Sequence, residues 1–311
     1  MLPPQALVAV DLGKSRCRAV LSGSRADGGR LSSRRLVYDG IGAPGLAAVG
    51  GVSAALTAIL PLRDRLDESI SALSVGAAGA WTAPDAASEL ALSLADALGV
   101  PVAVTSDVVS AHAGALGGRE GVLLIAGTGA AALGIDAHDA GSATLVDGWG
   151  PELGDFGSGS WLGREALRAV LRASAGLGPA TALTDEVATA IGAPAAIPAW
   201  LAQAGPLPRR LATIAPLVLN AAERGDACSA EIAAEGIRLL VASAVAASPG
   251  SHDVALHGGL TDHVWFRSSL ESALLVAGRA VAASSGDALD GALLLAERSD
   301  LPHERFVHRA E

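Results

Sequence analysis

Near its amino end the chain reads Val8-Ala9-Val10-Asp11-Leu12-Gly13-Lys14-Ser15-Arg16. The apolar run before Asp11 predicts a buried strand, and Gly13 allows a tight turn in which the backbone can approach a ligand closely. The apolar pattern resumes over residues 17–21, so the segment predicts strand, turn and strand. A Walker nucleotide-binding loop is excluded, because it needs a helix directly after its Lys-Ser pair and a Gly-x-x-x-x-Gly-Lys spacing.

Lys14 is the only lysine of the chain, and every other basic side chain is an arginine. A lysine is a compact point charge that suits phosphate, and the backbone amides of such a turn can cradle an anion. The same residues also fit an ordinary β-hairpin with a solvated lysine. Both interpretations stay open at this point.

The composition limits the class of protein. With 311 residues, half of them hydrophobic and only 3% aromatic, the chain predicts an α/β protein of two domains. A net charge of −10 argues against nucleic acid or an anionic membrane as partner. The two cysteines, Cys17 and Cys228, suggest no disulfide framework. The first apolar run ends at Asp11 without a preceding basic region, so it is no signal peptide, and we expect a cytoplasmic protein.

The pattern of the opening segment repeats in the second half of the chain. Two strand–turn–strand units lie about 115 residues apart, which predicts a duplicated architecture. We expect the strands at 6–11, 17–22, 32–38, 70–75, 100–104, 121–126, 130–135 and 253–257. We expect the helices near 46–60, 85–98, 108–116, 161–173, much of 180–247, and 288–298. The polar tail beyond Asp300 is expected to be loosely held.

Asp107 lies where a strand passes into a helix, directly after Thr105 and Ser106. That position places it at the carboxyl edge of a sheet, where α/β proteins commonly bind ligands. A carboxylate there could act as a general base. It could equally be a plain helix N-cap, because Asp is favoured at that position.

A glycine-rich loop carries the most specific pattern of the chain. It reads Gly148-Trp149-Gly150-Pro151-x-Leu153-Gly154-Asp155 and continues with Gly157-Ser158-Gly159. Four shorter stretches accompany it: Asp11-Leu12-Gly13-Lys14-Ser15, Ser106-Asp107, Ala126-Gly127-Thr128-Gly129 and His257-Gly258-Gly259. In order and interval, from residue 6 to about 297, the chain resembles the bacterial N-acetylglucosamine kinases of the BadF/BadG/BcrA/BcrD ATPase family, within the actin-like ATPase superfamily.

The resemblance implies a two-lobed, actin-like α/β fold, a duplicated ribonuclease H-like architecture with a central cleft. The lobes would be residues 1–118, joined by a C-terminal helix at 287–311, and residues 119–286. It also implies an enzyme that uses ATP and Mg²⁺ to phosphorylate the 6-hydroxyl of an amino sugar, with N-acetylglucosamine as the first choice. A homodimer is part of the same implication.

The resemblance assigns roles to particular residues. ATP and its phosphates would be bound by Asp11, Gly13, Lys14, Ser15, Gly127, Thr128, Gly129, Gly258 and Gly259. The sugar would contact Gly79, Asp107, Gly148, Trp149, Gly150 and Asp155. Asp107 would be the catalytic base, and Asp11 would hold Mg²⁺ through water.

Three departures from the family pattern leave the sugar open. Phe156 stands where the family has a glutamate, the 39–45 loop lacks an asparagine, and Ala130 and Ala131 follow the second glycine turn. Because a missing hydrogen-bond partner weighs heavily in specificity, glucosamine and glucose remain alternative substrates. A sugar-sensing or regulatory ATPase with weak catalysis is a further alternative.

Residues 127–132 also approach a dinucleotide-binding fingerprint, which would indicate a dehydrogenase. That fingerprint needs a helix next, whereas the residues up to Ile135 predict a strand.

Overall fold

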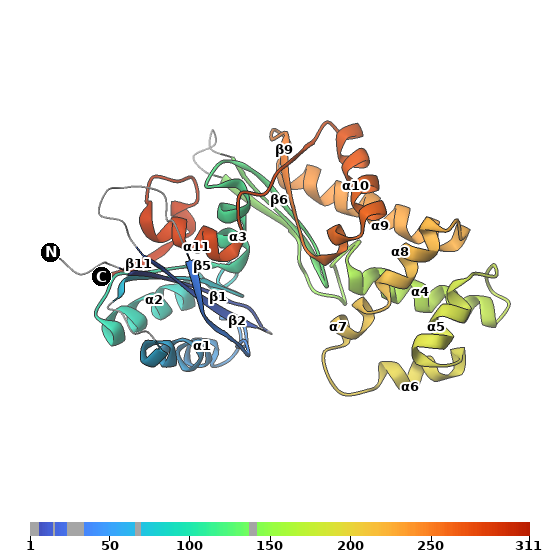
Figure 1. Ribbon diagram of the computed structural model, residues 1–311, viewed down its shortest axis with the longest axis horizontal. Coiled ribbons are helices and arrows are strands. Elements are labelled where there is room, and N and C mark those ends of the chain that lie inside the picture. Colours follow the sequence, from blue (N-terminus) through green and yellow to red (C-terminus); the bar gives the residue numbers. More distant parts are fainter. Residues whose placement is uncertain (1–5, 15, 24–33, 66–69, 137–141) are drawn as a thin grey trace. The chain divides into compact units, whose positions relative to one another are not determined.

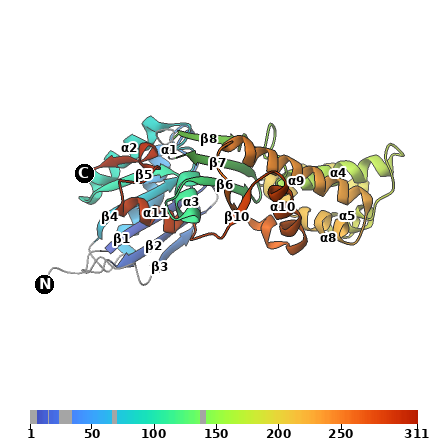
Figure 2. The same ribbon diagram turned by 90° about the horizontal axis from the view of Figure 1, so that it is seen from above.

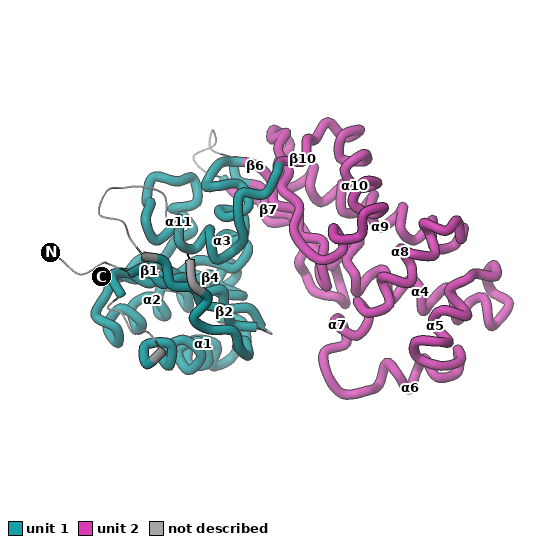
Figure 3. The backbone as a smooth tube through the Cα atoms, viewed as in Figure 1, with its two compact units in different colours: residues 1–120, 135–142, 283–311 teal, residues 121–134, 143–282 magenta. Residues whose placement is uncertain are grey.

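The computed structural model describes residues 6–14, 16–23, 34–65, 70–136 and 142–311 (Figure 1). The chain divides into two compact units (Figure 3). Unit 1 comprises residues 1–120, 135–142 and 283–311, and unit 2 comprises residues 121–134 and 143–282. Each unit is described by itself below.

Unit 1 is built on a six-stranded mixed sheet. Its strands are β1 (Ala6–Leu12), β2 (Cys17–Gly23), β3 (Arg34–Gly40), β4 (Ile70–Ala77), β5 (Val102–Ser106) and β11 (His308–Ala310). They lie in the order β11-β5-β4-β1-β2-β3. β1 runs antiparallel to β2 and parallel to β4, and β4 runs parallel to β5. The strand–turn–strand prediction for the opening segment is therefore confirmed.

Helices cover both faces of this sheet (Figures 1 and 2). They are α1 (Gly51–Ile59), α2 (Pro84–Leu98), α3 (Asp107–Leu116) and α11 (Ala288–Glu297), with 3₁₀ turns at Leu60–Arg65 and Glu304–Phe306. β1 is buried almost throughout because alternate side chains face different layers. Val8 and Val10 pack with α1 and α2, while Leu7 and Ala9 pack with α11.

The α3–α11 pair depends on two glycines. A Cβ on Gly114 would lie 1.8 Å from the carbonyl oxygen of Asp287, and one on Gly291 would lie 1.8 Å from that of Ser110. No larger residue fits at either position, so the helices cross with their backbones in close approach. The crossing fixes α11 against the helix that begins at Asp107.

Unit 2 is built on a five-stranded sheet in the order β10-β9-β6-β7-β8. Its strands are β6 (Gly121–Ala126), β7 (Ala130–Asp136), β8 (Ser142–Asp147), β9 (Asp253–His257) and β10 (Ala280–Ala282). Its helices are α4 (Gly159–Ser174), α5 (Leu183–Ile191), α6 (Ile197–Leu201), α7 (Leu207–Ala212), α8 (Ala215–Glu223), α9 (Ala227–Ala247) and α10 (Val264–Val276). Short 3₁₀ turns occupy Pro194–Ala196 and Gly259–Asp262.

The two sheets repeat one topology. In each, three consecutive strands lie side by side, and the first of them pairs in parallel with a later strand: β1 with β4, and β6 with β9. The next strand then adds in parallel, as β5 on β4 and β10 on β9. The predicted fold class, a duplicated actin-like α/β fold, is confirmed by this repeat and by the structural comparison reported below.

The structure corrects two expectations for the C-terminal tail. The tail beyond Asp300 is not loosely held, because β11 pairs antiparallel with β5, His308 opposite Val104. The implied helix over 287–311 is also wrong beyond Glu297, where a 3₁₀ turn and a strand replace it. Three other elements, β8, β10 and α10, had no sequence prediction.

Candidate functional site

In unit 1 the predicted phosphate turn follows β1. The turn closes through the Gly13 amide, which donates to the Arg16 carbonyl at 2.9 Å, and the Ala43 amide donates to Gly13 at 3.2 Å. Lys14 is exposed, and its Cε would lie 3.5 Å from a Cβ on Gly45. Ser15 lies outside the described residues.

Asp11 is half-buried and is paired with an arginine. Arg18 donates to its Oδ2 at 2.7 Å, and the second terminal nitrogen of Arg18 lies 3.8 Å from Asp287. Within the described part of the chain, no group of three or more His, Cys, Asp or Glu residues could hold a metal ion. A single carboxylate still fits Mg²⁺, which commonly keeps its waters and binds one or two carboxylates together with substrate phosphates.

Asp107 is the first residue of α3, and Ser106 is its N-cap. The Ser106 hydroxyl accepts from the Val109 amide at 3.2 Å, so the N-cap interpretation of Asp107 is wrong. The Asp107 Oδ1 accepts from the Val108 amide at 2.9 Å. Burial raises the pKa of Asp107 above its usual value, and the Val108 amide opposes that rise.

Strand register brings Asp11, Gly79 and Asp107 to one edge of the unit 1 sheet. Leu12 aligns with Ala77 on β4, and Ala77 aligns with Ser106 on β5, so the three parallel strands end side by side. The negative charge of Asp11 raises the pKa of Asp107 further, and the positive charge of Lys14 lowers that pKa. Both groups therefore act on the Asp107 carboxyl. Gly79 has φ +82°, and a Cβ there would lie 2.8 Å from the Leu46 amide nitrogen.

In unit 2 the second glycine turn joins β6 to β7 and rests on the start of α4. The Gly127 amide donates to the Gly129 carbonyl at 3.0 Å. The amides of Gly159 and Ser160 donate to Gly127 and Thr128 at 2.8 and 3.1 Å. Because the strand β7 follows the turn at once, the dinucleotide fingerprint is excluded.

Gly258 brings a third turn against the second one. Its φ is +110°, and a Cβ there would lie 2.6 Å from the carbonyl carbon of Ala126. A Cβ on Gly127 would in turn lie 3.7 Å from the Gly258 Cα and 3.9 Å from the Gly259 nitrogen. Only glycine permits this approach, so the Gly127–Gly129 turn and the Gly258–Gly259 turn, both predicted to bind ATP, lie side by side in unit 2.

The Gly-Trp-Gly loop follows β8 and returns to the second glycine turn. Gly148 and Gly150 have φ +74° and +89°. Trp149 is 63% exposed and meets Phe156 edge to face, with ring centroids 6.2 Å apart. Asp155, with φ +54°, is 9% exposed, and its Oδ1 accepts from the Ala130 amide at 3.3 Å. Burial raises the pKa of Asp155, and the Ala130 amide opposes the rise.

One residue of this loop was missed as a site residue. Asp147 is 3% exposed and has φ +63°. Its Oδ1 accepts from the Asp155 amide at 2.8 Å, and its Oδ2 accepts from the Phe156 amide at 2.7 Å. The sequence feature that could have identified it is an acidic residue directly before Gly148, at the end of a strand.

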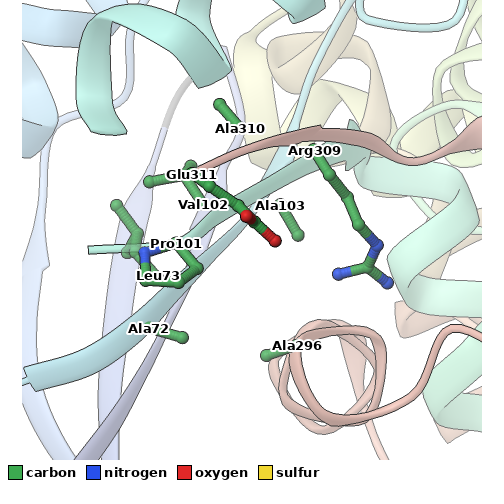
Figure 4. Close-up of a pocket in the computed structure, with 9 residues that line it drawn as sticks. All are labelled: Ala72, Leu73, Pro101, Val102, Ala103, Ala296, Arg309, Ala310 and Glu311. Atoms are coloured by element: carbon green, nitrogen blue, oxygen red, sulfur yellow. The ribbon is translucent and has the colours of Figure 1, made fainter. Parts of the chain in front are cut away.

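Unit 1 also contains a groove beside Ser106. Its volume is about 340 Å³, and it is lined by Ala80, Trp81, Pro84, Ser106, Arg305, Phe306 and His308. The rings of Trp81 and Phe306 stack with centroids 5.4 Å apart. A smaller cavity of about 100 Å³ lies near the amino ends of β4 and β5, where Leu73, Pro101 and Arg309 line it (Figure 4). That volume is well below the range usual for small-molecule sites, roughly 300–1,000 Å³.

Two units that share one strand order, each with a glycine turn between its first two strands, define an actin-like ATPase fold. Within that class, the chain belongs to the BadF/BadG/BcrA/BcrD ATPase family, whose model matches residues 8–296. This confirms the family that the sequence motifs resemble. Among the described residues, no helix has both the length and the apolar character to cross a membrane.

Similar proteins bear names of amino-sugar kinases. A solved structure from Chromobacterium violaceum, proposed to be an N-acetylglucosamine kinase, is 27% identical with a TM-score of 0.73, covering 94% of this chain and 98% of that one. An N-acetylmuramic acid/N-acetylglucosamine kinase of Clostridium acetobutylicum is 28% identical over 57% of this chain and 58% of that protein. An N-acetyl-D-glucosamine kinase of Dictyostelium discoideum is 42% identical over 25% and 24%. The chain thus spans less than two thirds of either curated relative.

Proposed function

We propose that the protein is an ATP-dependent sugar kinase that transfers the γ-phosphate to the 6-hydroxyl of N-acetylglucosamine. The observation that carries this proposal is the half-buried Asp107, whose carboxyl has a raised pKa, beside Asp11 and Lys14 at the carboxyl edge of the unit 1 sheet. A carboxylate whose pKa is raised is a better proton acceptor, as a general base must be. Membership of an ATPase family supports ATP as the donor.

Phosphoryl transfer depends mostly on positioning and on charge around the transferred group. In this proposal the turn after β1 and the Gly127–Gly129 turn each bind phosphate through amides other than those of Gly13 and Gly127, which close the turns themselves. Lys14 adds a positive charge. Asp11 would be the residue that holds Mg²⁺, and the bound ion would neutralise phosphate charge. Asp107 accepts the proton of the attacking hydroxyl.

The acceptor sugar is assigned to the Gly148–Asp155 loop. Trp149 offers an exposed ring. The Asp155 Oδ1 accepts from the Ala130 amide, and the carboxylate can also accept from sugar hydroxyls. Gly79 is kept as a sugar contact from the family resemblance alone, because the space of its missing Cβ is filled by the backbone of residues 45–47. A homodimer is retained from the family resemblance.

One observation favours a second candidate, a sugar-sensing ATPase with little turnover. The ion pair of Arg18 with Asp11 competes with the cation that Asp11 would hold. Acceptor-dependent ADP formation separates the two. A kinase releases ADP only as fast as sugar phosphate appears, whereas a sensor binds sugar without stoichiometric product.

A coupled ADP assay over N-acetylglucosamine, N-acetylmuramic acid, glucosamine and glucose tests the proposal, with the product identified by mass spectrometry. We expect the highest kcat/KM for N-acetylglucosamine. ADP release that is the same with and without every sugar would refute the kinase assignment.

Phe156→Glu is expected to change sugar preference and leave ATP binding nearly unaltered. The substitution restores a polar group beside Trp149, where a hydrogen bond to a sugar hydroxyl can discriminate between substrates by about 10-fold or more. The measurement is the kcat/KM ratio of N-acetylglucosamine to glucose, together with the KM for ATP. Leu153→Glu, at a 75% exposed position of the same loop, is the matched control. An unchanged ratio would show that residue 156 does not face the sugar.

A further inference from the structure

Asp147 occupies an unusual place for a carboxylate. It ends β8 with a positive φ and is almost fully buried, yet no arginine or lysine pairs with it among the contacts of the described residues. Its partners are two consecutive backbone amides, those of Asp155 and Phe156. Hydrogen bonds from N–H groups to an ionised carboxylate are roughly twice as strong as neutral ones. The side chain therefore closes residues 148–154 into a loop on its own carboxylate.

The interior of this loop is shaped around the Asp147 carboxylate. A Cβ on Gly154 would lie 2.3 Å from the Asp147 Oδ1 and 3.0 Å from the Trp149 Cβ. The loop also carries its own turn, since the Gly154 amide donates to the Gly150 carbonyl at 2.7 Å. The carboxylate thus occupies space that a side chain at position 154 would need, and it sets the distance between the two ends of the loop.

A second carboxylate continues the connection to the glycine turn. The Asp155 amide is held by Asp147, and the Asp155 side chain accepts from the Ala130 amide. A Cβ on Gly129 would lie 2.9 Å from the Asp155 Oδ1, so the carboxylate packs directly on the Gly127–Gly129 turn. Asp147 itself has no recorded contact with that turn among the described residues. The strand β8, which ends at Asp147, also lies beside β7, and a Cβ on Gly148 would lie 3.3 Å from the Ala131 Cβ. The Asp155 side chain is the connection that reaches the Ala130 amide itself.

We propose that Asp147 is a positioning residue that couples acceptor binding to nucleotide binding, by holding the 148–156 loop and, through Asp155, the Gly127–Gly129 turn. The inference rests on the proposed function, in which the loop binds the sugar and the turn binds phosphate. A sugar that orders the loop then also orders the Asp155–Ala130 contact. The nucleotide binds a turn that is already held, and its affinity rises. By linkage, the nucleotide raises the affinity for sugar by the same factor.

Two substitutions separate the parts of this role. Asp147→Gly removes both acceptor oxygens and leaves a residue that tolerates φ +63°. Asp147→Asn also tolerates that conformation but offers one acceptor oxygen for the two amides. Glu152→Gln is the matched control, because Glu152 is an exposed acid of the same loop.

The coupling factor is the ratio of the Kd of a non-hydrolysable ATP analogue without and with N-acetylglucosamine, measured by calorimetry on the full chain. Coupling between sites is typically about 5–150-fold, and we expect a factor in that range for the wild type and for Glu152→Gln. It should fall to about 1 in Asp147→Gly and lie between in Asp147→Asn. A factor in both Asp147 variants equal to that of the wild type would overturn the proposal, because a merely structural residue lowers stability without removing the coupling.

Hydrogen exchange of the unliganded protein provides a test that needs no activity. The amides of Asp155 and Phe156 should exchange faster in Asp147→Gly, and the Ala130 amide should follow. If the wild type phosphorylates no sugar, the proposed function fails, and the Ala130 amide then decides the inference alone. Faster exchange at Ala130, with the other β7 amides exchanging as in the wild type, supports the connection through Asp155. Exchange at Ala130 that matches the wild type overturns it.

Discussion

Asp107→Asn is expected to lose about 10²–10⁴-fold of acceptor-dependent turnover, the usual contribution of a positioned general base. Sugar and ATP binding should change little, because the amide has nearly the same size as the carboxyl. It also keeps an oxygen for the Val108 amide. The same variant should unfold at a higher temperature than the wild type.

The stability gain follows from the direction of the pKa shift. Burial raises the pKa of Asp107 above its unfolded value, so the folded state holds the proton more tightly. Stability contributed by this group is therefore lost as the pH rises from the unfolded pKa through the folded one, and at neutral pH the buried charge destabilises the fold. An ionised residue in the first turn of a helix gains roughly 0.3–1 kcal/mol from the helix dipole. Burial is the largest cause of the raised pKa, and we expect it to outweigh that gain.

Asp85→Asn is the matched control, because Asp85 occupies the first turn of α2 as Asp107 occupies that of α3, but is exposed. It should leave turnover unchanged and should not raise the unfolding temperature. Near-normal turnover of Asp107→Asn would refute the base assignment. An unfolding temperature at or below that of the wild type would contradict the burial penalty.

His303→Gln is expected to make the protein markedly less sensitive to acid. His112 on α3 and His303 in the C-terminal segment are both fully buried, and the Nδ1 of His112 lies 2.8 Å from the Nε2 of His303. One of these nitrogens must donate and the other accept, which a doubly protonated pair cannot do. Burial, followed by the neighbouring His112, lowers the pKa of His303 to about 3.

The sign of the acid effect is fixed by this lowered pKa. The neutral imidazole contributes stability that is fully present above the unfolded value of 6.5 and is lost as the pH falls towards about 3. The loss is about 1.4 kcal/mol for each pH unit within that window, or about 5 kcal/mol across it. Urea unfolding at pH 7.5, 6.0 and 5.0 measures how the free energy of unfolding changes with pH.

The free energy of unfolding of His303→Gln should depend less steeply on pH than that of the wild type, by the equivalent of about one bound proton. His252→Gln should keep the pH dependence of the wild type. His252 serves as control because it is exposed and its ring bonds a backbone carbonyl, that of Gly278. Equal slopes for His303→Gln and the wild type would contradict a neutral, buried His303.

Much of the fold could be predicted because local pattern and tertiary burial agree. The run before Asp11 is apolar at nearly every position, as a strand buried on both faces requires, and β1 is such a strand. β11 could not be predicted in the same way. Its three residues form a strand only by pairing with β5, about 200 residues earlier in the chain, and their own composition gives no such indication.

In the candidate site, too, some residues could be predicted from the sequence and others could not. Gly79 and Gly258 have a positive φ, and a Cβ at either position would collide with backbone. Because only glycine is suited to such positions, a pattern of glycines in the sequence predicts them. Asp147 acts on amides eight and nine residues ahead, and that depends on how the loop closes. From the sequence, Asp107 could be either a general base or the N-cap of a helix. In the structure the N-cap of α3 is Ser106.

Direct detection of the phosphorylated product is the most decisive test of the sugar kinase proposal. The wild type is incubated with ATP, Mg²⁺ and N-acetylglucosamine, and the products are resolved by phosphorus NMR. We expect N-acetylglucosamine 6-phosphate and ADP in equal amounts, with neither formed by Asp107→Asn at a comparable rate. ADP accompanied by inorganic phosphate, with no sugar phosphate from any member of the sugar panel, would contradict the account.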